Sequence, residues 1–265
     1  MDAPVDLPEL EVLPSELELL TLAYACDIDG VCVFFLECCW AGDSHRAKAV
    51  ASLFDLAAAV GGFCRLSPDQ LRARMPELRA VWLDGYYEPT VAAPLVGGLV
   101  ALALACKNGH PGLAQWITDY FGFDGSRAPV VHFSVLLDAA CIGGRLDVAR
   151  WLADRFGETM CAVHASTAFG LACRSGCLPL VEWLAGWLVG RIGMPSSVLR
   201  AASVDDLPNV CGRGHATTAR WLIEHFELSG AEVRHSRHEG GAAWAVAQRL
   251  PGRDLADWMS ARFGF

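Results

Sequence analysis

Cysteine and histidine are the residue types in this chain that could bind a metal ion or act as a nucleophile. The 265 residues include 11 cysteines and 8 histidines. No Cys-x-x-Cys pair occurs, and Cys211 with His215 is a lone i,i+4 pair without a matching second half. His225, His235 and His238 could come close together, but a polar loop explains them more simply. We therefore expect no metal site and no cofactor.

Catalytic motifs are also missing. A nucleophile needs a base and an orienting group, and neither a Ser-His-Asp nor a Cys-His set can be paired from this sequence. The glycine pairs at 61–62, 97–98 and 240–241 lack the Gly-Lys, or the preceding strand, of a phosphate-binding loop. The sequence predicts a protein that is not an enzyme. A hydrolase or redox enzyme on a helical fold is the alternative, which activity screening would reveal.

Composition predicts a folded cytoplasmic protein. With 53% hydrophobic and 19% charged residues, the chain can bury a large core. The uncharged run Pro89 to Cys106 contains Pro94, so a turn followed by a buried helix explains it better than a membrane span. The N-terminus lacks the basic start and apolar run of a secretory signal, and an odd number of cysteines cannot all pair within one chain.

Charge is concentrated at one end. Residues 1–60 hold two basic side chains, Arg46 and Lys48, against eleven acidic ones, which accounts for the net charge of −9. An acidic surface repels phosphate backbones, so a nucleic-acid partner is disfavoured. We interpret this end as a solubilising segment.

A repeated frame is the main organising feature of the sequence. In four segments a cysteine precedes a tryptophan by ten residues and a glycine precedes it by seven. Weaker copies around Cys39, Trp82 and Trp258 extend the period in both directions, which makes about seven units. The four clear copies are Cys106/Gly109/Trp116, Cys141/Gly144/Trp151, Cys173/Gly176/Trp183 and Cys211/Gly214/Trp221.

Each unit is predicted to be a pair of helices. Residues 145–157 repeat apolar side chains every three or four positions, as an amphipathic helix does. The preceding helix is rich in Ala and Cys, so we interpret the cysteines as small buried side chains and the tryptophans as core residues. The glycine between the helices supplies the positive φ that such a turn commonly needs.

Because one unit cannot cover its own apolar face, the units must stack and the end units must differ. Residues 14–26 are predicted to form a capping helix with Ser15 as its N-cap. We therefore divide the chain into an acidic N-terminal segment and capping helix, 1–30, and a single elongated repeat array, 31–265.

The repeat resembles the ankyrin family. The family's spaced signature looks like Ala140-Cys141, Gly144, Val148 and Trp151-Leu152 here, and the clear match covers about residues 98 to 228. The family's Thr-Pro-Leu-His start is absent, with Thr167 the nearest approach. Trp-rich arrays of this kind resemble those that giant DNA viruses encode in large families. The resemblance implies an all-α, ankyrin-type helical-repeat solenoid of about seven helix pairs.

The resemblance also implies a non-catalytic scaffold that binds a protein through its concave face, in the host cytoplasm if the chain is viral. Three cations at one repeat height would suit an acidic surface or peptide, although ordinary solvated residues would give the same pattern. Two alternatives stay open: a ubiquitin-ligase adaptor, from an F-box-like segment at 13–20, and self-assembly into a homodimer through terminal units such as 256–265. The residues implied for partner binding are Lys107, Asn108, His132, His164, Arg174, Ser175 and Arg213.

Overall fold

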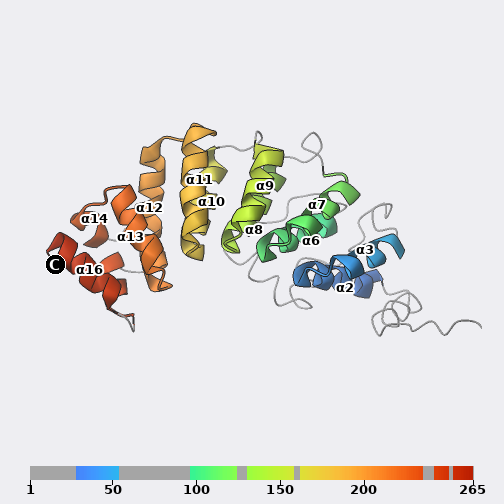
Figure 1. The fold of residues 1–265 in the computed structure, drawn as a ribbon, viewed down its shortest axis with the longest axis horizontal. Helices are drawn as coiled ribbons and strands as arrows, with labels where there is room; N and C mark the ends of the chain where they lie inside the picture. The colour runs from blue at the N-terminus through green and yellow to red at the C-terminus, as the bar shows by residue number, and fades with distance from the viewer. Residues whose placement is uncertain are drawn as a thin grey trace, which may run out of the picture. The chain divides into compact units, whose positions relative to one another are not determined.

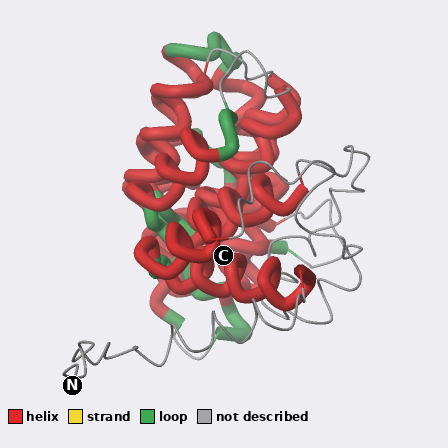
Figure 2. The backbone as a smooth tube through the Cα atoms, turned by 90° about the vertical axis from the view of Figure 1, so that its right-hand side faces the viewer, coloured by secondary structure: helices red, strands yellow, loops and turns green. Residues whose placement is uncertain are grey.

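The fold is all-α throughout the part of the chain that the structure describes. A computed structural model describes residues 28–53, 96–123, 130–157, 162–234, 242–250 and 253–264. These residues form thirteen helices and no strand (Figures 1 and 2). The chain divides into two compact units, Met1–Ala101 and Leu102–Phe265. The all-α prediction is confirmed for these ranges.

In the first unit two helices pack against each other, α2 (Ile28–Ala41) and α3 (Ser44–Leu53). Gly42, with φ of 75°, makes the turn between them, and Asp43 Oδ1 accepts a hydrogen bond of 3.0 Å from the Arg46 backbone N–H. Phe35 and Cys39 are fully buried. The predicted capping helix at 14–26 and the repeat copy around Trp82 lie outside the described residues.

Each of the four clear sequence repeats forms the predicted pair of helices. In every pair the tryptophan lies on the second helix and the cysteine near the end of the first. The first helix, α6, crosses the boundary between the units. The pairs are α6 (Val96–Asn108) with α7 (Pro111–Tyr120), α8 (Val130–Ile142) with α9 (Leu146–Phe156), α10 (Ala162–Ser175) with α11 (Leu178–Gly190), and α12 (Ser196–Gly212) with α13 (Ala216–His225).

The last part of the chain is less regular. It contains the short helices α14 (Gly230–Arg234) and α15 (Ala243–Ala247), followed by α16 (Asp254–Phe263). The helix α15 packs against α12, and α16 packs against α15. Trp258, the weak fifth copy of the repeat tryptophan, lies on α16.

The first helices of successive pairs form the core of the second unit. Helix α10 packs against α8 on one side and α12 on the other, as well as against its own partner α11. Figure 1 shows the pairs α8–α9, α10–α11 and α12–α13 side by side in chain order. Ala168, Ala172 and Cys173 of α10 are fully buried, and such small side chains let neighbouring helices approach closely. The interpretation of the repeat cysteines as buried small residues is therefore confirmed for Cys106, Cys141, Cys173 and Cys211.

The repeat tryptophans are half-buried, which corrects their interpretation as core residues. The rings of Trp183 and Trp187 stack with centroids 5.9 Å apart, and those of Trp221 and His225 with centroids 4.3 Å apart. The Arg220 guanidinium of α13 lies 5.5 Å from the centre of the Trp258 ring on α16. Trp258 thus contacts a neighbouring helix while it remains partly accessible to solvent.

The turn glycines have two separate reasons to be glycine. Gly109, Gly144, Gly176 and Gly214 all have φ between 67° and 80°, a conformation that other residues rarely adopt. At three of them the residue after the turn glycine of the next pair packs against the glycine, so that an added Cβ would collide at Gly109 and Gly176 and would be crowded at Gly144. Arg145 packs against Gly109 in this way, Cys177 against Gly144 and His215 against Gly176.

Hydrogen bonds also join successive turns. Arg145 Nε donates to the Lys107 carbonyl over 3.2 Å, and Thr218 Oγ1 donates to the Gly176 carbonyl over 3.1 Å. The turns therefore satisfy carbonyl groups that the helix ends leave without intrahelical partners.

Among the described residues, no helix combines the length and hydropathy needed to cross a membrane.

Two matched substitutions separate the roles of the turn glycines. Gly176→Ala should lower the free energy of unfolding by about 2–4 kcal/mol, because backbone strain adds to a collision with His215. Gly214→Ala should cost about 1–2 kcal/mol, since its φ is equally positive but no atom lies within 4 Å of the added Cβ. Urea denaturation measures both. If both substitutions lowered the free energy of unfolding equally, successive turns would not pack as described. The same would follow if adding His215→Ala did not restore part of the stability that Gly176→Ala removes.

Candidate binding surface

The predicted binding residues fall at the two opposite ends of the inner helices, by which we mean the first helix of each pair. Lys107 and Asn108 end α6, Arg174 and Ser175 end α10, and Arg213 follows α12 directly. His132 and His164 are each the third residue of their helix, α8 and α10. His164 is half-buried, whereas the side chain of His132 lies outside the described part of the structure.

The structure therefore does not bring the two groups together. His164 and Arg174 are ten residues apart on one straight helix, which separates them by about 15 Å along its axis. A ligand at the turn end of the helices would contact the cations and the amide, and one at the other end would contact the histidines.

The Arg174 side chain already has carboxylate neighbours. Its Nε lies 3.5 Å from Asp206 Oδ1 of α12, and the two side chains are 22% and 20% exposed. Asp206 in turn packs against Gly170 of α10, where a Cβ would collide with its carboxylate. Arg174 thus joins α10 to α12 instead of projecting into solvent as a free cation.

Ser175 and Lys107 also serve the turns. Ser175 Oγ donates to the Ala172 carbonyl over 2.8 Å and accepts from the Cys177 backbone N–H over 3.3 Å. Lys107 is half-buried, and this burial lowers the pKa of its ammonium group. Arg213 is exposed, so the three predicted cations differ in how much of each can meet a partner. Their role in binding stays a prediction.

The repeat cysteines are poorly suited to chemistry. Burial raises the pKa of the Cys211 thiol to about 12 and also raises the pKa values of Cys106, Cys141 and Cys173 well above the usual range. Thiols with such pKa values stay protonated at neutral pH and are weak nucleophiles and weak metal ligands. In the described ranges no three His, Cys, Asp or Glu side chains gather as they would around a metal ion.

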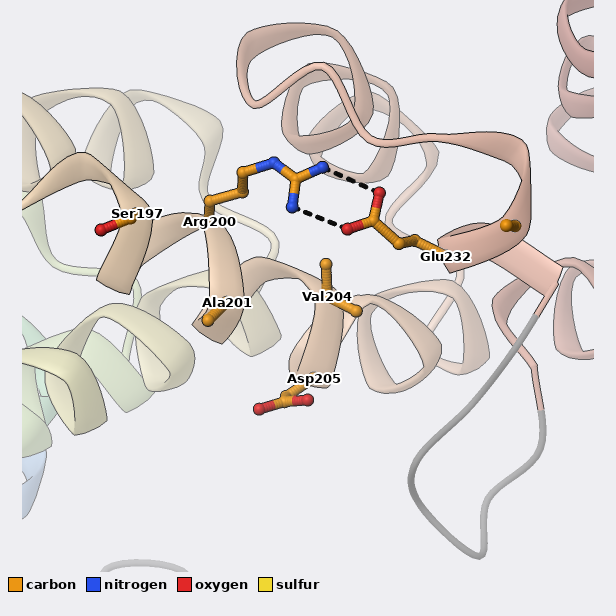
Figure 3. Close-up of a pocket in the computed structure, with 7 residues that line it drawn as sticks. Ser197, Arg200, Ala201, Val204, Asp205 and Glu232 are labelled. Carbon is orange, nitrogen blue, oxygen red and sulfur yellow. Dashed lines mark hydrogen bonds and ion pairs between the residues drawn. The ribbon is translucent and has the colours of Figure 1, made fainter.

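An open groove between α12 and α14 was missed by the sequence analysis. Its volume is about 390 Å³, and an ion pair between Arg200 and Glu232 crosses it (Figure 3). The guanidinium binds the carboxylate through two hydrogen bonds of 2.6 and 2.8 Å, and Arg200 Nε donates to the Phe226 carbonyl over 3.1 Å. The lining residues are Ser197, Arg200, Ala201, Val204, Asp205, Ala231 and Glu232.

Glu232 also caps the N-terminus of α14. Its Oε2 accepts from the Ser229 backbone N–H over 2.8 Å and from Ser229 Oγ over 2.7 Å. This is a capping box, and the spacing Ser229-x-x-Glu232 is the sequence signal that could have predicted it. Arg200 and Glu232 are thus occupied with each other and with the backbone, and their ion pair joins α14 to α12.

No protein-family model, curated protein or solved structure matches the chain. The resemblance to ankyrin repeats therefore depends on the residues of the sequence frame. The assignment of a function depends on the geometry of the helix pairs.

Replacing Glu232 tests the ion pair through its pH dependence. The hydrogen bonds from Arg200, with smaller contributions from Ser229, lower the pKa of Glu232 from 4.5 to about 2. Its stabilising effect is therefore complete above pH 4.5 and is lost as the pH falls through 2. Glu232→Gln should lower the free energy of unfolding by about 1 kcal/mol at pH 7, and by less at pH 3.

Urea denaturation at both pH values provides the measurement. Glu182→Gln, at an exposed position of α11, is the matched control and should change stability at neither pH. A Glu232→Gln protein as stable as the wild type at pH 7 would rule out a structural role for the pair.

Proposed function

We propose that this chain is a non-catalytic, protein-binding repeat protein with an ankyrin-type helical solenoid. The observation that carries the proposal is the recurring turn: four glycines of positive φ follow four inner helices in one sequence frame. Stacked pairs of this kind place equivalent side chains at regular intervals along an extended surface, which suits recognition of another protein. The residues of the Cys, Gly and Trp frame support the ankyrin type.

We place the binding surface at the turn end of the inner helices. Among the three predicted cations Arg213 is the exposed one, and half-buried Lys107 and Asn108 lie at the equivalent height of α6. Arg174 contributes less, because its charge is compensated by Asp206. The partner that this surface fits is an acidic protein segment, and its attraction depends on Arg213 more than on a stripe of three cations. A viral origin and a host partner in the cytoplasm follow from the resemblance alone.

The two alternative functions gain no support from the described residues. The F-box-like segment at 13–20 lies outside them, so an adaptor role stays a prediction. On α16 the apolar residues Leu255, Ala256 and Met259 are buried within the chain itself, and Trp258 and Phe263 are half-buried, so self-assembly through 256–265 stays a prediction.

Affinity capture with a charge-reversed surface tests the proposal. The full chain, immobilised and exposed to lysate of its native cell, should retain specific proteins that mass spectrometry identifies. Arg213→Glu should reduce their recovery at least tenfold, because an acidic partner then meets a like charge. Arg150→Glu reverses an equally exposed cation on α9 and should leave recovery unchanged.

Equal recovery by both variants would remove the turn end as the binding surface. Capture of no protein above a background column would contradict the binding function as a whole.

A further inference from the structure

Asp138 departs from the repeat frame at a buried position. It lies on α8 three residues before Cys141, and the equivalent residues of the other clear repeats are uncharged: Ala103, Gly170 and Pro208. The residue is 7% exposed, between Leu137 and Ala139, which are also buried. A carboxyl group has therefore replaced a small or apolar residue inside the packed layer of inner helices.

The surroundings of Asp138 do not stabilise a carboxylate fully. Its Oδ1 is inaccessible to water and has no hydrogen-bond partner among the described residues. Transferring a charge into such a site is costly unless it is paired and hydrogen-bonded, whereas a protonated carboxyl is much easier to bury. A buried polar atom without a partner in a packed core calls for an explanation.

Arg174 is the cation that bears on this carboxyl. It lies on α10, which packs directly against α8, and its positive charge favours the ionised form of Asp138. The same guanidinium lies 3.5 Å from Asp206 on α12. One arginine thus interacts electrostatically with acidic side chains from both of the helices that pack on either side of α10.

Other ionisable groups near the site are weaker influences. Within α8 the Cys141 thiol responds to the Asp138 charge, and its own pKa is raised well above the usual range by burial. On α10 the remaining ionisable side chains are His164, at the far end of the helix, and the buried Cys173. On α9 all four charged side chains are exposed: Asp147, Arg150, Asp154 and Arg155.

We infer that Asp138 is a proton-binding switch in the interface of α8 with α10: protonated, it fits the buried site, and ionised, it weakens this packing and draws Arg174 away from Asp206. This regulation goes beyond the proposed binding function. Arg174 lies at the turn end of α10, which is part of the proposed binding surface. A change in the charge of Asp138 would therefore alter that surface through Arg174.

The sign of the pH effect follows from burial. Burial raises the pKa of Asp138 from 3.8 to about 7, against a smaller lowering by Arg174. Between these two values the folded state holds a proton that the unfolded state has lost, so stability falls as the pH rises and levels off above 7. Asp138 therefore gains or loses its proton at a pH close to neutral.

Substitution of Asp138 tests the inference. The equilibrium constant for unfolding of the wild-type chain should rise at least tenfold between pH 5 and pH 8, since each unit of pKa difference is worth a factor of ten. Asp138→Asn cannot ionise, so it should lose this dependence and be more stable than the wild type at pH 8. Asp154→Asn, at an exposed position of α9, should keep the wild-type dependence.

A direct titration keeps the inference testable if the variant does not fold. The carboxyl carbon of Asp138 in the wild-type chain, followed by NMR, should titrate near pH 7, and a midpoint near 4 would overturn the switch. Asp206→Asn should lower this midpoint, because Arg174 is then free to pair with Asp138. An unchanged midpoint would show that Arg174 does not move between the two carboxylates.

Discussion

The close approach of neighbouring helix pairs is the constraint on which the described structure of residues 102–265 depends. An inner helix such as α10 has a neighbour on each side, so small side chains are needed where the helices approach most closely. Alanine and cysteine provide them on the helices, and glycine does so at the turns, where an added Cβ would collide with His215 and be crowded by Cys177. Hydrophobic burial then stabilises pairs that could not cover their own apolar faces alone.

Much of this arrangement could be predicted from the sequence, because it follows from the spacing of cysteine, glycine and tryptophan in each repeat. The ten-residue and seven-residue offsets to tryptophan place the buried cysteine and the turn glycine correctly in all four clear repeats. Spacing does not show which neighbour a side chain meets, and the tryptophans were therefore interpreted as core. The four repeat tryptophans are instead half-buried on the second helix of each pair, and Trp258 of α16 contacts Arg220 of α13.

The candidate site was harder to predict, because the spacing of residues along the chain does not show which side chains meet between repeats. The frame placed Lys107, Arg174 and Arg213 at helix ends, but Asp206, the partner of Arg174, lies in another repeat and outside the frame. The Arg200–Glu232 pair was missed because α14 is short and has no counterpart in the regular repeats. The pairs Arg174–Asp206 and Arg200–Glu232 therefore join helices, and we infer that the charge of Asp138 makes one of these connections depend on pH.

Native-state hydrogen exchange of the full chain tests most directly whether each helix pair is stabilised by its neighbours. Local opening should require more free energy for a pair covered on both sides than for one at the end of the stack. The amides of α10, between α8 and α12, should therefore exchange slowest, and exchange should quicken towards α16. Equal exchange rates from α8 to α16 would show that the helices unfold as one unit and would contradict the account.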